Sequence, residues 1–190
     1  MIAVKIPGTR KFLADLLSRN TFDSFVLGEA TLTTFTSFHI DGTWHPDYFQ
    51  DDRRKIAGSA ESAESVSRNP AAGPVRSSSS VPEKETEPSW QRLRPYVSGL
   101  VKGSHSPVSF RIVLKMAPKG IEGVLKNSGS SFTPDQVDGL FMNISYQDGK
   151  ITCTSGTSMK TFTMDKSLDH AWDQMMLKFF DAKAIPYEQL

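Results

Sequence analysis

A run of basic side chains in the middle of the chain is the first candidate for chemistry. Seven Lys and Arg residues lie between Gln91 and Asn127, where Glu122 is the single acid. Lys and Arg contact phosphate groups, and these contacts supply most of the sequence-independent affinity of proteins for nucleic acids. The run therefore predicts a local patch for an anionic partner, either a nucleic acid or a phosphate-bearing ligand. The residues expected to bind this partner are Arg92, Arg94, Lys102, His105, Arg111 and Lys115.

The same residues have two other interpretations. Alternating faces of a helix and a strand need charged side chains for solubility, whether or not they bind anything. Internal docking is the second alternative, because Ser128 to Leu190 carries eight acids against five bases and could neutralise the patch. The formal net charge of the whole chain is only +1, so a site that attracts anions must be local.

A hydroxyl-rich segment, Thr152 to Lys160, is the second candidate and predicts a tight turn between two strands. Ser158 and Lys160 are two positions apart, which on a strand would put both side chains on one face, as a Ser/Lys nucleophilic pair requires. With a histidine such as His39 or His105, the segment would suit a small hydrolase or transferase. Ser158 and Lys160 are also expected to contact an anionic ligand. An ordinary polar turn explains the same composition without chemistry.

Histidine and cysteine usage predicts no metal site and no cofactor. The four histidines are scattered, and none has the spacing of a recognised metal motif. His170 and Asp173 are three positions apart on an expected helix, where a solvated face explains them equally well. Cys153 is the single cysteine, so an internal disulfide and a zinc site built from several thiolates are excluded. We expect Cys153 to be a small buried side chain in a protein of the cytoplasm.

The elements that would position these residues are clearest in the C-terminal half. A helix is predicted from Asp165 to Lys183, with a buried stripe that includes Trp172, Met175, Met176 and Phe180. Before it, strands are predicted at 140–146, 151–155 and 159–164. Asp148-Gly149 predicts the tight turn of a hairpin between the first two, because both residues tolerate positive φ.

The N-terminal half and the middle supply the other predicted elements. A strand is expected at 1–6, a helix at 9–19, two strands within 22–40, a helix at 90–102 and a strand at 108–116. A short helix is expected at 121–126. Since neither half has a complete set of elements, the sheet must draw strands from both.

Between Pro46 and Ser89 the composition changes to Ser, Pro, Ala, Glu and Arg, and periodicity is lost. We predict a disordered insertion within the domain, covering at least 56–88. The Ser77 to Ser80 run could be a phosphorylation target or part of a docking arm. A passive linker is the alternative.

Length and composition favour one domain. A chain of 190 residues that is 38% hydrophobic can bury a sizeable core. No stretch reaches the ~20 apolar residues that span a bilayer, and no secretory signal is visible, so we expect no membrane association. The predicted fold is a single α+β domain over 1–190, with an antiparallel or mixed sheet of about five to six strands, about three helices and a long disordered insertion.

Several stretches carry a resemblance to a known family. They are MIAVKI, then TFDSFVLGEATLTTFTSFHIDG, then WQRLRPYVSGLVKG with SPVSFRIVLKM, then GLFMNISYQDGKITCTSGTSMKTFTMDKSLDHAWDQMMLKFF. In this order they resemble an uncharacterised family of Firmicutes, domain of unknown function 5721, over the chain outside 46–89. The resemblance implies a cytosolic bacterial protein and implies no activity or site residues.

Three functions remain open on the sequence alone. The leading hypothesis is a non-enzymatic module that binds an anionic partner through the basic run. The second is a hydrolase or transferase that uses the Thr152 to Lys160 segment. The third is a structural protein that dimerises through the helix face bearing Trp172, Met176 and Phe180, and the sequence does not predict the oligomeric state.

Overall fold

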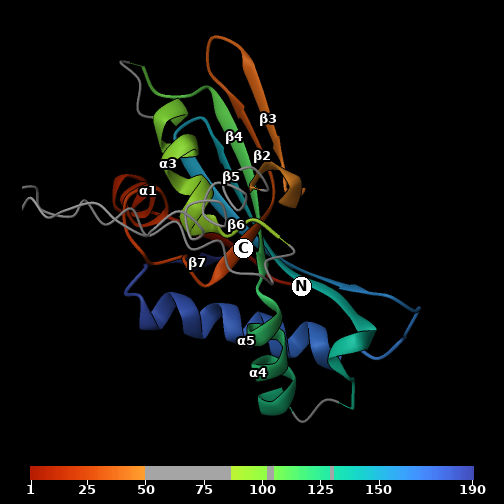
Figure 1. Cartoon of the computed structure of the whole chain (residues 1–190). Helices are drawn as coiled ribbons and strands as arrows, with labels where there is room; N and C mark the ends of the chain where they lie inside the picture. The colour runs from red at the N-terminus through yellow and green to blue at the C-terminus, as the bar shows by residue number, and fades with distance from the viewer. Residues whose placement is uncertain (50–86, 102–104, 129–130) are drawn as a thin grey trace, which may run out of the picture. The chain divides into compact units, whose positions relative to one another are not determined.

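A computed structural model describes residues 1–49, 87–101, 105–128 and 131–190 (Figure 1). Residues 1–43 and 87–190 form one compact unit, to which all the strands described below belong. Residues 44–86 form a second unit, whose described part contains a 3-10 helix, Pro46–Phe49. At the other end of the predicted insertion, 46–89, Ser89 bridges to Val26. The remainder of that prediction, 50–86, lies outside the described residues, as does Lys102.

The first unit is built on a seven-stranded sheet in which every neighbouring pair is antiparallel. Its order is β3-β2-β4-β5-β6-β1-β7, so the N-terminal strand pairs with a strand from the C-terminal half. The strands are β1 Ala3–Ile6, β2 Phe25–Thr33, β3 Ser37–Asp41, β4 Ser109–Met116, β5 Val137–Gln147, β6 Lys150–Met159 and β7 Glu188–Gln189.

Four α-helices pack on one face of this sheet. They are α1 Thr9–Leu17, α3 Trp90–Val101, α4 Pro118–Ser128 and α5 Ser167–Ala182. Figure 1 shows α4 lying beside α5, while α1 and α3 lie near each other at another part of the sheet. The helices and the strands contribute to a single hydrophobic cluster, and the burial of these apolar side chains is the main stabilising term of the fold.

Alternation along the strands decides which side chains face the helices. On β4, Phe110, Ile112 and Leu114 are buried in the helix-covered core. Arg111 and Lys115 have the opposite parity, so they point to the other face of the sheet. The four α-helices of the first unit pack on the opposite face, so we call this one the open face.

The α+β class and the antiparallel sheet are confirmed, with seven strands rather than five or six and with α4 as a full fourth helix. The hairpin turn is confirmed as well, because Asp148 and Gly149 have φ of 50° and 76°. Positive φ at both central positions is the geometry of a type I′ turn.

Two local predictions are wrong. The segment Thr152 to Lys160 is not a turn, because β6 continues to Met159. The separate strand predicted at 159–164 does not form, since Met159 is the last residue of β6 and 160–164 are not in a strand. Pairing with β5 along the whole of β6 overrides the turn composition. Gly156, which would ordinarily favour a turn, lies within this strand opposite Phe141.

The helix stripe predicted near the C-terminus is largely confirmed. Trp172, Met176 and Phe180 of α5 are at most 1% exposed, so the chain itself covers the face that we considered for dimerisation. That face is therefore not available to a second copy. Met175 is the exception within the stripe, because 38% of its surface is exposed.

Candidate functional site

A row of polar side chains crosses the open face and is the strongest candidate site. The strand register pairs Arg111 on β4 with Thr31 on β2 and with Ser145 on β5. The same register continues outward on both sides, from β3 to β1, at about 4.8 Å per strand. The row is His39, Thr31, Arg111, Ser145, Thr152 and Lys5.

The neighbouring rows differ in charge. The row on one side contains one cation and no acid, and its members are Ser37, Thr33, Ser109, Gln147 and Lys150. On the other side, Asp41 lies opposite Glu29, so the acids of β2 and β3 are gathered in a third row. The open face therefore has a basic, hydroxyl-rich half and a half that carries two acids. We call the first two rows the Arg111 rows.

Arg111 is the centre of this half. Its side chain is exposed, and among the described residues it has no hydrogen-bonding or acidic partner. A guanidinium presents a planar set of donors that matches the oxygens of a phosphate or carboxylate. Thr31 and Ser145, directly opposite Arg111, add hydroxyl groups that can donate to the same oxygens. Arg111, Thr31 and Ser145 therefore place hydrogen-bond donors next to one another on the open face.

The two ends of the row are tied to neighbouring groups. His39 Nδ1 lies 3.3 Å from Thr31 Oγ1. Lys5 Nζ lies 3.3 Å from Glu188 Oε2, and both side chains are well exposed. Since exposed ion pairs of this kind contribute only about 0 to 1 kcal/mol, an anion could compete with Glu188 for Lys5.

The structure does not bring the whole predicted basic run together. Arg92 and Arg94 lie on α3, on the helix-covered side, whereas Arg111 and Lys115 point to the open face. Arg94 donates to Asp23 Oδ1 at 2.5 Å and to the carbonyl oxygen of Arg19. These contacts hold α3 against the segment that precedes β2.

The remaining basic residues of the run are placed separately. Lys115 Nζ lies 2.5 Å from Glu87 Oε1, and both side chains are mostly buried, so its charge is neutralised locally. Arg92 is half-buried on α3, and His105 is exposed before β4. Of the predicted residues that the structure describes, Arg111 is the one that lies at the centre of a row of potential ligand-binding groups.

The predicted nucleophilic pair is held in other contacts. Ser158 Oγ donates to Asp138 Oδ2 at 2.9 Å, and the Lys160 backbone N–H donates to the Gln136 carbonyl oxygen at 2.9 Å. Lys160 lies beyond the end of β6 with an exposed side chain. His39 is four strands away from Ser158 in the sheet, about 19 Å at normal strand spacing. The structure therefore places His39 out of reach of Ser158.

A polar seam between β6 and α5 was missed in the sequence. Ser155 donates to Asp173 Oδ1 at 2.5 Å, the Met1 amine donates to Asp173 Oδ2 at 2.7 Å, and the Ile2 N–H donates to Ser155 Oγ at 2.8 Å. One turn away, Thr157 donates to Asp169. The sequence did contain a signal for this seam. Ser155 and Thr157 are two positions apart on a strand, and Asp169 and Asp173 are four positions apart on a helix, so each pair presents its side chains on one face.

The electrostatics of this seam are those of a structural contact. Burial by itself would raise the pKa of Asp169, but the hydrogen bonds from Thr157 and Lys166, with the Lys166 and N-terminal charges, hold it below its ordinary value. Lys166 Nζ lies 3.2 Å from Asp169 Oδ2. The Asp169 carboxylate is therefore stabilised in its charged form and suits a fixed contact better than proton transfer.

Cys153 is buried on β6, as predicted. Burial raises the pKa of its thiol far above the ordinary range, because the thiolate would have no water around it. The thiol is therefore held in its neutral form within the core.

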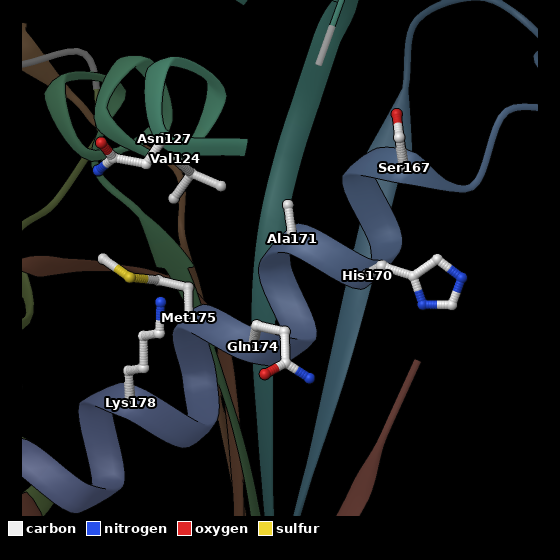
Figure 2. Close-up of a pocket in the computed structure, with 8 residues that line it drawn as sticks. All are labelled: Val124, Asn127, Ser167, His170, Ala171, Gln174, Met175 and Lys178. Carbon is white, nitrogen blue, oxygen red and sulfur yellow. The ribbon is translucent and has the colours of Figure 1, made fainter. Parts of the chain in front are cut away.

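A shallow pocket of about 640 Å³ lies between α4 and α5 (Figure 2). Val124, Ala171 and the exposed Met175 give it an apolar surface. Figure 2 shows the His170 ring pointing away from α4, so its nitrogens do not converge with the polar groups near α4. Its full lining is Val124, Asn127, Ser167, His170, Ala171, Gln174, Met175 and Lys178.

Two further features are absent from the residues that the structure describes. No three His, Cys, Asp or Glu side chains lie close enough together there to hold a metal ion. In the same part of the chain, no helix has both the length and the apolar composition that crossing a membrane would require.

Comparison with known proteins identifies the family without supplying an activity. No curated protein matches the chain, and no solved structure matches it. The family match extends into the predicted insertion on both sides and leaves 67–75 outside. Residues 15–66 and 76–188, most of the chain, match the family of unknown function DUF5721, and the chain therefore belongs to this family.

Proposed function

We propose that this chain is a non-enzymatic binding module that takes a phosphate-bearing partner on the Arg111 rows. The observation that carries the proposal is the position of Arg111, exposed and without an acidic partner among the described residues, between Thr31 and Ser145. A phosphate would accept from the guanidinium and from both hydroxyls. Charge-assisted hydrogen bonds of this kind are the strong ones in anion recognition.

The charges on the open face set the direction in which an extended ligand would run. The Arg111 rows contain Lys5, Arg111 and Lys150 and no acid between β3 and β1, and Glu188 of β7 continues the central row beyond Lys5. Glu29 and Asp41 in the third row would repel phosphates. An extended anionic strand is therefore expected to follow the Arg111 rows across the β-strands rather than along one β-strand.

The modest number of cations favours a weak and salt-sensitive complex. Each phosphate contact releases counterions, so affinity falls as salt rises, with a slope set by the number of contacts. Three cations give a shallow slope compared with dedicated nucleic-acid-binding proteins. The proposal keeps the cytoplasm as the compartment, supported by the single buried cysteine.

The test is fluorescence anisotropy with labelled mixed-sequence single-stranded and double-stranded nucleic acids at low and near-physiological salt. Arg111→Ala is expected to weaken binding about tenfold or more, the scale of a lost charge-assisted hydrogen bond. The affinity of Arg111→Lys should lie between those of the native chain and Arg111→Ala, since lysine keeps the charge but lacks the planar guanidinium. Lys126→Ala is the matched control, because Lys126 is an exposed cation on α4.

Competition with inorganic phosphate and pyrophosphate shows whether the site binds the phosphates of a nucleic acid or those of a small ligand. Displacement of the nucleic acid by millimolar pyrophosphate would identify a small phosphate ligand as sufficient. Equal affinities of native chain, Arg111→Ala and Lys126→Ala, or no binding of any probe at low salt, would reject the proposal.

A further inference from the structure

Among the described residues, no strand pairs with the outer edge of β3. β3 is the first strand in the sheet order and pairs with β2 on one side only, and no described strand lies on its other side. An exposed strand edge presents backbone donors and acceptors that can pair with another strand. The opposite edge of the sheet is β7, which has only two residues. β3 is therefore the better template of the two.

The side chains of β3 alternate symmetrically about its central residue. Ser37, His39 and Asp41 are exposed and belong to the open face. Phe38 and Ile40 are half-buried on the helix-covered side. The order of polar and apolar positions is therefore symmetric about His39. Antiparallel pairing of two copies needs this symmetry, because it sets like positions opposite each other.

We propose that β3 pairs with β3 of a second copy of this chain, antiparallel, about a two-fold axis at His39. Ser37 would then lie opposite Asp41 of the partner subunit, and Phe38 opposite Ile40 of the partner subunit. The first pair allows a hydroxyl-to-carboxylate hydrogen bond, and the second is an apolar cross-strand pair. No two charges of the same sign are opposite each other while His39 is neutral.

The register follows from the length of the strand. An axis at His39 pairs all five residues of β3, whereas an axis at Phe38 or Ile40 would leave three pairs within the strand and set its other two residues against residues outside it. A second copy suits this edge better than an unrelated strand. In self-pairing, the alternation of β3 itself sets each apolar position opposite an apolar position, whereas an unrelated strand would need a matching sequence. The rows of one sheet then continue into the other.

The pairing would extend the open face. Because His39 is in the same row as Arg111, the central rows of the two copies would join end to end. The two Arg111 side chains would lie five strand spacings apart, about 24 Å. This inference does not depend on the proposed function, since the edge can pair whether or not Arg111 binds a phosphate.

Five residues from each copy make a small interface, below the area of most stable complexes. We therefore expect a concentration-dependent dimer. Light scattering of the native chain should give a mass that rises above 21.1 kDa, toward twice that value, as concentration increases. A mass of one chain at all accessible concentrations would overturn the proposal.

Cysteine cross-linking tests the register directly. His39→Cys places two thiols opposite each other, at the 4.5 to 5.5 Å Cα separation of paired residues, which roughly matches disulfide geometry. With dissolved oxygen as oxidant, an interchain disulfide should form. The native thiol does not interfere, because Cys153 is buried. His39 is exposed, so the substitution should leave the fold intact.

Ser37→Cys is the matched control. In the proposed register the two copies of residue 37 are four positions apart, about 14 Å, too far for a disulfide. An equal mixture of Ser37→Cys and Asp41→Cys chains should instead form the mixed disulfide. If Ser37→Cys alone cross-links as well as His39→Cys, or if neither cross-links because another strand occupies the edge, the proposal fails.

Discussion

The Ser155 hydroxyl donates to Oδ1 of Asp173 across 2.5 Å, joining β6 to α5 between residues eighteen positions apart. Both residues are almost fully buried, at 1% and 6% exposed. Ser155 Oγ also accepts from the Ile2 backbone N–H, and the other Asp173 oxygen accepts from the Met1 amine. Two side chains thus connect β1, β6 and α5, three elements from opposite ends of the sequence.

Ser155→Ala should therefore destabilise the fold by about 1 to 3 kcal/mol, because it leaves Asp173 Oδ1 and the Ile2 N–H without their partner. Urea unfolding followed by circular dichroism measures this loss. Ser145→Ala is the control, since Ser145 is exposed on the open face and its replacement should change stability by less than about 0.5 kcal/mol. If the two substitutions change the free energy of unfolding equally, the hydrogen bonds of Ser155 do not stabilise the fold.

Trp172 joins the same helix to the neighbouring strand. Its Nε1 donates to the Phe141 carbonyl oxygen at 2.9 Å, and the residue is 1% exposed. Trp172→Phe should lower the free energy of unfolding by about 1 to 3 kcal/mol, through the lost donor and the space left by the smaller ring. Phe162→Ala is the control, because Phe162 is 93% exposed. This substitution should change the free energy of unfolding little in the same urea titration.

The pH dependence of stability should contain a contribution from Asp169. Its pKa is lowered in the folded chain, so the carboxylate stabilises the fold above the pKa of the unfolded chain, about 3.9. That stabilisation is lost as pH falls through the folded pKa. The difference in unfolding free energy between native chain and Asp169→Asn should shrink from pH 6 toward pH 2.

A matched substitution separates this effect from the general loss of stability in acid. Asp135 is an exposed acid at the surface, so the difference between native chain and Asp135→Asn should be small and should vary little over the same range. If the Asp169→Asn difference is also flat with pH, then the contacts from Thr157 and Lys166 do not stabilise the charged form.

The thiol of Cys153 should not react with Ellman's reagent in the folded chain. It is fully buried, and burial raises its pKa, so the reactive thiolate is scarce even at pH 8. Reaction should follow unfolding and become fast in high urea. Rapid reaction without denaturant would mean that β6 opens readily or that the thiol has a chemical role.

The hairpin and the core of α5 could be predicted because local signals determine them. Asp148-Gly149 specifies its turn through the positive φ that both residues tolerate. The spacing of Trp172, Met176 and Phe180 specifies one buried helix face. Local composition failed for Thr152 to Lys160, where a long ladder with β5 determines the structure.

The site was harder to predict because it depends on pairings between distant segments. The basic run was visible in the sequence, but alternation and helix packing send Arg94 and Arg111 to opposite sides of the sheet. The strand order β3-β2-β4 then decides that Thr31 and His39 lie in the row of Arg111. No spacing within the sequence indicates that order.

Arg94 provides the last prediction, because it was expected to bind ligand and is instead bonded to Asp23 at 2.5 Å. Both side chains are mostly buried, so removing one partner leaves the other charge without its main hydrogen bond. Arg94→Ala and Asp23→Ala should each destabilise the fold, and a double-mutant cycle should give a coupling energy of about 0.5 to 3 kcal/mol. In the anisotropy assay, Arg94→Ala should bind nucleic acid like the native chain at temperatures where it remains folded. A loss of binding as large as that of Arg111→Ala, without loss of structure, would place the ligand on α3 and not on the open face.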